Sequence, residues 1–182
     1  MEFQKIETSQ LVLRRPEDAD SQEFYFLRTD ERVNQFVTRE RPVALSDASA
    51  FIRNINMGIE EGKCFYWCIC LANKPRAIGT ICLWNMSSDR KVAEVGYELR
   101  PDFQGRGFMS EALQAVLLFG FHVLELDTIL AITHVSNYAS ARLLERTGFH
   151  LNQSPKDGLN PDELGYQVSR KRTDKNLREN CP

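Results

Sequence analysis

The chain has 182 residues, of which 42% are hydrophobic and 26% are charged, and its formal net charge is −2. This composition is typical of a soluble globular protein, and the length suits one domain with a sizeable core. The near-neutral charge argues against nucleic acid or an anionic membrane as a partner, because both favour a strong basic excess.

The first elements predicted are a strand and a helix. The apolar run at 11–15 is typical of a short strand and is ended by Pro16. Acidic residues follow the proline and suit the first turn of a helix, where they face the positive end of its dipole. Phe24, Leu27 and Val33 would then lie on the apolar face of that helix.

A second helix is predicted over residues 44–62. Ser46 or Asp47 is expected to cap its amino end, because both side chains accept hydrogen bonds from free helix amides. Gly62 is expected to end it, since glycine readily adopts the left-handed conformation that follows many helices.

Three strand-like runs come next. Residues 64–72 and 76–84 are rich in β-branched and aromatic side chains and flank a turn at 73–75, so we expect a hairpin. A third run, at 92–100, alternates apolar and polar residues and is ended by Pro101.

The last part of the chain alternates helices and strands. The predicted elements are a helix ending near Leu124, a strand at 128–135, a helix at 137–149 that ends at Gly148, and strands at 149–151 and 164–169. This order predicts a mixed α/β sheet rather than a doubly wound one. We expect a single domain over residues 1–169, followed by a basic, flexible tail at 170–182.

The cysteines and the amino end indicate an intracellular protein. Five cysteines are present, no two form a CxxC pair, and the three histidines are distant in sequence. We therefore interpret the cysteines as buried, reduced thiols and expect no metal site. The first ten residues lack an apolar signal core, and the stretch from Leu113 to Leu126 is too short and interrupted to cross a bilayer. A cytoplasmic location is expected.

Residues 103–113, FQGRGFMSEAL, join the third strand-like run to a helix. The first amides of a helix lack partners within it and point outward, and glycine lets a phosphate approach the backbone closely. Arg106 could add positive charge. However, the segment has neither the Lys-Ser/Thr of a P-loop nor the third glycine of a dinucleotide fingerprint. By itself it is compatible with an anion site or with a plain turn.

Read as a whole, GYELRPDFQGRGFMSEAL resembles the acetyl-CoA-binding motif of the GCN5-related N-acetyltransferases (GNAT). In that family a strand leads into a loop of the form Gln/Arg-x-x-Gly-x-Gly/Ala. Gln104, Gly107 and Met109 occupy those three places. Met109 departs from the small residue expected there, which matters little if only its backbone amide is used.

Two further segments resemble the RimJ/RimL-type branch of that family: IETSQLVLRRPEDADSQEFYFLRTDERV near the amino end and VSNYASARLLERTGF late in the chain. The resemblance covers roughly Ile6 to Ser169. It implies the GNAT fold, a mostly antiparallel sheet of six to seven strands that splays between the fourth and fifth strands and is flanked by about four helices.

The resemblance implies transfer of an acetyl group from acetyl-CoA to a primary amine by direct attack, without an acyl-enzyme. Backbone amides would bind the diphosphate, and the pantetheine arm would pair with the strand edge near Leu99 and Arg100. A backbone amide near Leu99 would polarise the thioester carbonyl. The expected acetyl-CoA-binding residues are Leu99, Gln104, Gly105, Arg106, Gly107, Phe108, Met109, Ser110 and Asn137.

The incoming amine must lose a proton to a carboxylate or an ordered water. Glu94 and Glu98 lie on one face of the strand and are the candidate bases, although each could equally face solvent; His134 is a third candidate. Many family members place a tyrosine on the late helix as proton donor, but Leu144 stands there. The RimJ/RimL-type branch instead carries a serine, and Ser140 fills its place.

The acceptor is left open between the α-amine of a protein, as in ribosomal-protein acetylation, and a small-molecule amine. The alternative function is a non-catalytic acyl-CoA-binding sensor that keeps the Gly-rich loop but lacks an acceptor pocket. A nucleotide-binding protein is a more distant alternative. The chain could act as a monomer or a homodimer.

Overall fold

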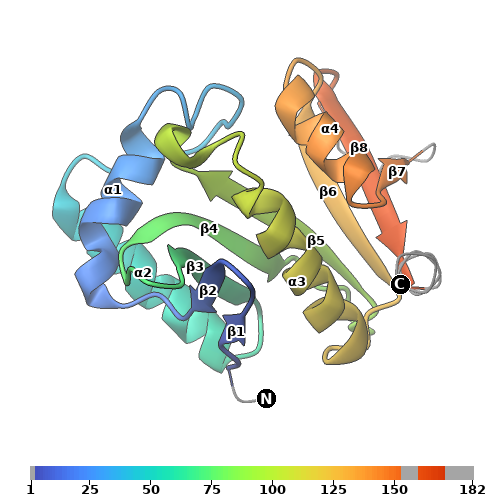
Figure 1. Ribbon diagram of the computed structural model, residues 1–182, viewed down its shortest axis with the longest axis horizontal. Helices are drawn as coiled ribbons and strands as arrows, with labels where there is room; N and C mark the ends of the chain where they lie inside the picture. Colours follow the sequence, from blue (N-terminus) through green and yellow to red (C-terminus); the bar gives the residue numbers. More distant parts are fainter. Residues whose placement is uncertain (1–2, 153–159, 171–182) are drawn as a thin grey trace.

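The structure is a computed structural model that describes residues 3–152 and 160–170. Eight strands form one sheet in the order β1-β2-β3-β4-β5-β6-β8-β7 (Figure 1). The strands are β1 (Ile6–Glu7), β2 (Leu11–Arg14), β3 (Phe65–Leu71), β4 (Ala77–Trp84), β5 (Val92–Leu99), β6 (Thr128–His134), β7 (His150–Leu151) and β8 (Glu163–Ser169). The α-helices are α1 (Ser21–Thr29), α2 (Leu45–Glu60), α3 (Phe108–His122) and α4 (Tyr138–Arg146).

The pairing of β5 with β6 sets the shape of the sheet. Within the described residues, neighbouring strands run antiparallel except β5 and β6, which are parallel. These two strands pair over only three positions, from Val92 with Thr128 to Glu94 with Leu130. Beyond them β6 and β8 turn away from β5, as Figure 1 shows. We call the resulting gap, bordered by residues 95–99 of β5, the opening.

The two faces of the sheet are covered by different helices. In β3 the side chains alternate, so that Trp67 lies in the cluster formed with α3 whereas Cys68 lies in the cluster formed with α1 and α2. The ring of Phe119 on α3 meets that of Trp67 edge to face, with centroids 5.2 Å apart. On the other face, Phe24 of α1 and Ile52 of α2 are fully buried.

The predicted mixed α/β fold is confirmed. The sheet gains an eighth strand because residues 6 and 7 form the short β1 against β2. The opening therefore lies between β5 and β6, which are the fourth and fifth strands when β1 is not counted. Residues 171–182, which contain almost all of the predicted tail, lie outside the described residues.

Two local predictions need correction. Helix α1 ends at Thr29, so Val33 lies in the turn beyond it and not on the apolar face of the helix. The N-cap of α2 is Ala44, and neither Ser46 nor Asp47 occupies that place. Asp47 acts from within the first turn, where its Oδ2 accepts hydrogen bonds from the amides of Val43 (2.9 Å) and Ala44 (3.0 Å).

An ion pair between Arg14 and Asp20 fixes the entry to α1. Arg14 donates from its two terminal nitrogens to the two carboxylate oxygens, at 2.7 and 2.6 Å. The Asp20 carboxylate also accepts from the amide of Glu17 at 2.9 Å. Its side chain is only 5% exposed. The pair therefore ties strand β2 to the segment that leads into α1.

Replacing Asp20 should destabilise the fold, because Asp20→Ala leaves the Arg14 guanidinium without its partner. We expect the free energy of unfolding in urea to fall by about 3 kcal/mol. Glu7→Ala removes a partner of Lys5 in an exposed ion pair and should leave unfolding unchanged. A loss at Asp20 no larger than that of the control would contradict this role.

Candidate active site

The Gly-rich loop, residues 104–110, follows the end of β5 and includes the first residues of α3, which begins at Phe108. A single turn of 3₁₀-helix at Pro101–Phe103 follows the strand, and Gln104 comes directly after it. The side-chain amide of Gln104 turns back and donates to the carbonyl oxygen of Leu99 at 3.0 Å. This bond holds the beginning of the loop against the end of β5.

Two glycines allow the loop to bend. Gly105 has φ +71° and Gly107 has φ +84°, both in the left-handed region that favours glycine. A Cβ added at either position would meet no atom within 4 Å. The space outside the loop is therefore open to a ligand, and the need for glycine here is conformational.

The amides of residues 105–110 face outward at the amino end of α3. Among the described residues, none of these amides donates a hydrogen bond. Phe108 and Met109 are buried residues, at 6% and 9% exposure, and their side chains belong to the core cluster. The amino end of a 15-residue helix also carries positive dipole charge. Together these groups can bind an anion.

Contacts with the amino-terminal segment fix the first turn of α3. Glu111 accepts hydrogen bonds from the hydroxyl of Ser9 (3.1 Å) and from the amide of Gln10 (2.9 Å). Arg106 is exposed, and its Cζ lies 5.3 Å from the ring centroid of Phe108. Its charge is therefore available at the rim of the Gly-rich loop.

The free edge of β5 presents peptide groups to the opening. The amide of Arg100 donates to the carbonyl of Ile78 at 2.9 Å, so it points toward β4. Because peptide groups alternate along a strand, those of Tyr97 and Leu99 point the other way, toward the opening. A ligand with amide groups could pair with them as an additional strand does.

Ser140 lies across the opening from β5, in the first turn of α4. Asn137 caps this helix, since its Oδ1 accepts from the amide of Ser140 at 3.2 Å. The hydroxyl of Ser140 lies 2.8 Å from the phenolic oxygen of Tyr97. Burial raises the pKa of Tyr97 to about 12. The bond links the two sides of the opening.

Glu94 and Glu98 both lie on the α1–α2 side of the sheet and neither faces solvent. Glu94 is 5% exposed, stands where the pairing with β6 ends, and accepts from the side-chain amide of Asn85 at 3.2 Å. Glu98 forms an ion pair with Arg39 at 2.6 Å, and its other oxygen accepts from Thr80 at 3.2 Å. The two carboxylates thus have different surroundings.

The other candidate donors and bases are placed less favourably. The ring of His134 stacks on that of Phe36 with centroids 5.5 Å apart, and its Nδ1 accepts from the amide of Ser136. On α4, Tyr138 is 68% exposed, whereas Leu144 is buried and its side chain has no hydrogen-bond donor. Of Tyr138, Ser140 and Leu144, Ser140 is the residue whose side chain forms a hydrogen bond with Tyr97 of β5.

Cys68, Cys70 and Cys82 lie in strands β3 and β4 and Cys64 directly precedes β3, whereas Cys181 lies outside the described residues. Cys68 and Cys70 are buried, whereas Cys64 and Cys82 are half-buried. Burial raises the pKa of Cys70 to about 11 and that of Cys82 to about 12, so both remain thiols at neutral pH. In the described part of the chain, no group of three or more His, Cys, Asp and Glu side chains is placed to hold a metal ion.

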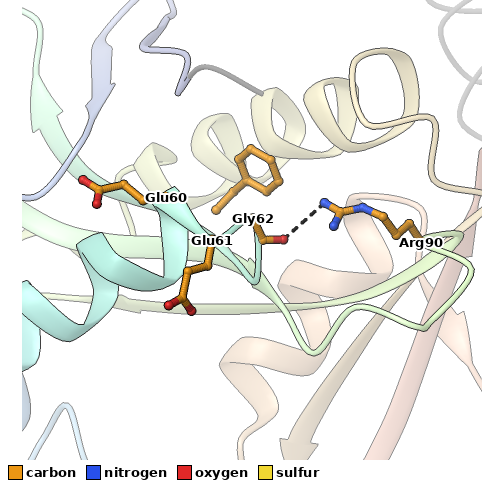
Figure 2. Close-up of a pocket in the computed structure, with 5 residues that line it drawn as sticks. Glu60, Glu61, Gly62 and Arg90 are labelled. Atoms are coloured by element: carbon orange, nitrogen blue, oxygen red, sulfur yellow. Dashed lines mark hydrogen bonds between the residues drawn. The ribbon is translucent and has the colours of Figure 1, made fainter.

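A separate cavity of about 370 Å³ lies at the end of α2 (Figure 2). Glu60 and Glu61 border it, but each has its own ion-pair partner, Arg15 and Lys63 respectively. Arg90, which lies two residues before the start of β5, donates to the carbonyl of Gly62 at 3.2 Å. The Gly-rich loop lies beyond the other end of this eight-residue strand, which is roughly 23 Å long.

The structure places the predicted residues on β5, in the Gly-rich loop and at the start of α4, and it adds two residues that sequence analysis missed. Tyr97 is one of the apolar positions that alternate along residues 92–100, and this pattern gives no sign of a role for its hydroxyl. Arg39 lies in the connection between α1 and α2, which carried no motif. Its contact with Glu98 spans 59 residues of sequence, and no local pattern signals such a contact.

The comparisons with known proteins establish the family. A profile of the acetyltransferase (GNAT) domain matches residues 10–150. The uncharacterized N-acetyltransferase YoaA of Bacillus subtilis is 30% identical over 147 residues, covering 81% of this chain and 83% of that protein. The chain therefore belongs to the GNAT family of N-acetyltransferases, and it is an acyltransferase.

Solved structures share the fold. An acetyltransferase (GNAT family) from Bacillus anthracis superposes with a TM-score of 0.78 at 23% identity, covering 92% of this chain and 99% of that one. RimL, a ribosomal L7/L12 α-N-protein acetyltransferase in complex with coenzyme A, gives 0.76 at 20% identity, with 91% and 98% covered. Among the described residues of the present chain, no helix is long and apolar enough to span a membrane.

The Gly-rich loop can be tested by filling the space outside Gly107. Gly107→Trp places an indole over the free amides, and we expect the dissociation constant of coenzyme A in calorimetry to rise about a hundredfold, as for the loss of two charge-assisted hydrogen bonds. Gly62→Trp is the matched control, because Gly62 also has positive φ (+67°) but lies near the other cavity. Equal affinities in the two variants would contradict the assignment.

Proposed function

We propose that this chain transfers the acetyl group of acetyl-CoA to a primary amine by direct attack. The observation that carries the proposal is the row of outward-facing amides at residues 105–110, beside the opening in the sheet. Their geometry suits a diphosphate, which accepts several hydrogen bonds at once and carries the negative charge that a helix amino end favours. Arg106 adds a positive charge beside them.

The rest of the coenzyme follows the opening. Its pantetheine arm contains amide groups that can pair with the peptide groups of Tyr97 and Leu99. Asn137 caps α4 on the opposite side, and its side chain can bond to the same arm. The backbone amide near Leu99 would also polarise the thioester carbonyl, on whose oxygen negative charge develops during attack.

Glu94 takes the proton of the incoming amine, directly or through a water. Its carboxylate lies at the point where β5 and β6 separate, and one of its oxygens accepts a hydrogen bond from the side-chain amide of Asn85. Protonation of Glu98 would instead disrupt its ion pair with Arg39. Arg39 also donates to the Asn34 side chain at 2.7 Å, so Glu98 anchors the segment that follows α1. Glu98 thus orders the acceptor side of the site.

The acceptor is an amine on a protein amino terminus or on a small molecule. Two structural relatives support the first class: RimL, named for ribosomal L7/L12 α-N-protein acetylation, and a ribosomal-protein-S5-alanine acetyltransferase from Vibrio fischeri. A panel of peptides with free α-amines and of small amines, incubated with acetyl-CoA and followed by mass spectrometry, tests the reaction. We expect acetylated product from at least one amine. Coenzyme A binding with no acetylation of any amine would favour the sensor.

The two carboxylates should give different kinetic signatures. Glu94→Gln removes the base, and we expect it to flatten the acid limb of the pH–rate profile and lower kcat about a hundredfold. Glu98→Gln keeps that limb but weakens the contact with Arg39, so KM for the amine should rise. A flat acid limb in Glu98→Gln with a normal limb in Glu94→Gln would reverse the two assignments.

A further inference from the structure

The hydrogen bond between Tyr97 and Ser140 connects elements that the sheet leaves apart. Pairing of β5 with β6 ends at Glu94, and Tyr97 lies three residues further along the unpaired edge. Its phenolic oxygen nevertheless lies 2.8 Å from the hydroxyl oxygen of Ser140 on α4. The bond therefore spans the opening in which the proposed function places the thioester.

The chemistry of the two hydroxyls indicates which one donates. A phenol is a far stronger acid than an alkyl alcohol, so it is the better hydrogen-bond donor of the pair. Burial holds the Tyr97 phenol in its protonated form at neutral and mildly alkaline pH. The proton of Tyr97 therefore points at the Ser140 oxygen, and the Ser140 proton must point elsewhere.

The position of Ser140 limits where that proton can go. The amide of Ser140 is bonded to the Asn137 side chain, which fixes the residue in the first turn of α4. Among the described residues, the only side-chain partner recorded for its hydroxyl is Tyr97. With one lone pair engaged by the phenol, the hydroxyl proton is free to reach a group that enters the opening.

We propose that Tyr97 is a positioning residue that directs the Ser140 hydroxyl toward the sulfur of the departing coenzyme A. This inference rests on the proposed function. When the amine nitrogen bonds to the thioester carbon, the carbon–sulfur bond breaks and its electron pair stays on sulfur. Ser140 donates a hydrogen bond to this thiolate, and Tyr97 donates to Ser140. Both hydroxyls keep their protons, and the proton of the amine leaves through the base.

Two hydroxyls in series stabilise a thiolate better than one does, because each donated bond polarises the next. Leu144, one turn further along α4, is buried and apolar and offers no donor. Tyr138 is mostly exposed. The donor that supports Ser140 therefore comes from the strand and not from the helix that carries the serine.

The test measures the pKa of the coenzyme A thiol in its complex with the protein, from the ultraviolet absorbance of the thiolate, and it needs no acceptor amine. We expect the thiol pKa to be about one unit higher with Tyr97→Phe than with the wild-type protein, a tenfold loss of thiolate at a given pH. Tyr66→Phe is the matched control, because it also removes a phenol–hydroxyl bond, to Thr80, on the other face of the sheet. It should leave the thiol pKa unchanged.

A double-mutant cycle separates a positioning role from a structural one. If Tyr97 acts through Ser140, Ser140→Ala raises the thiol pKa, and adding Tyr97→Phe to it produces no further rise. Equal thiol pKa values in wild type and Tyr97→Phe, or independent additive effects, would overturn the inference. Melting temperatures and coenzyme A affinities report any loss of folding. Failure of the wild-type protein to bind coenzyme A would overturn the proposed function itself, and this inference with it.

Discussion

The limited pairing between β5 and β6 is the constraint on which the site depends. Three residue pairs hold these parallel strands together, and beyond them the strands diverge (Figure 1). An unpaired strand edge inside a fold carries peptide groups that need partners. In this chain those groups are the amide and carbonyl of Tyr97 and the amide of Leu99, since the Leu99 carbonyl already accepts from Gln104. They lie where an amide-containing ligand can supply the missing bonds. The opening is thus part of the binding chemistry.

The Gly-rich loop complements that edge because it orients a second set of free backbone groups. Left-handed Gly105 and Gly107 turn the chain from β5 into α3, and the buried side chains of Phe108 and Met109 anchor the helix from below. Glu111 adds a connection to the amino-terminal segment. The orientation of the amides is therefore fixed before a ligand binds, and this reduces the conformational entropy lost on binding.

Local sequence patterns predicted the elements well but gave less information about the site. Alternation in residues 92–100 placed Glu94 and Glu98 on one face, yet it could not show that Glu94 is buried or that Arg39 forms an ion pair with Glu98. That contact depends on how the segment after α1 folds back over the sheet, for which propensity gives no rule. Likewise Tyr97 follows the apolar pattern, and only the tertiary structure brings its hydroxyl to Ser140. The short β1 was missed because two residues show no periodicity.

The account depends most directly on the backbone of the Gly-rich loop as the binding site of the coenzyme diphosphate. The amide chemical shifts of ¹⁵N-labelled protein during titration with coenzyme A report this binding residue by residue. We expect the largest changes at residues 105–110, with smaller ones along the free edge of β5. Unchanged shifts in the loop, with changes gathered instead around Gly62 and Arg90, would contradict it.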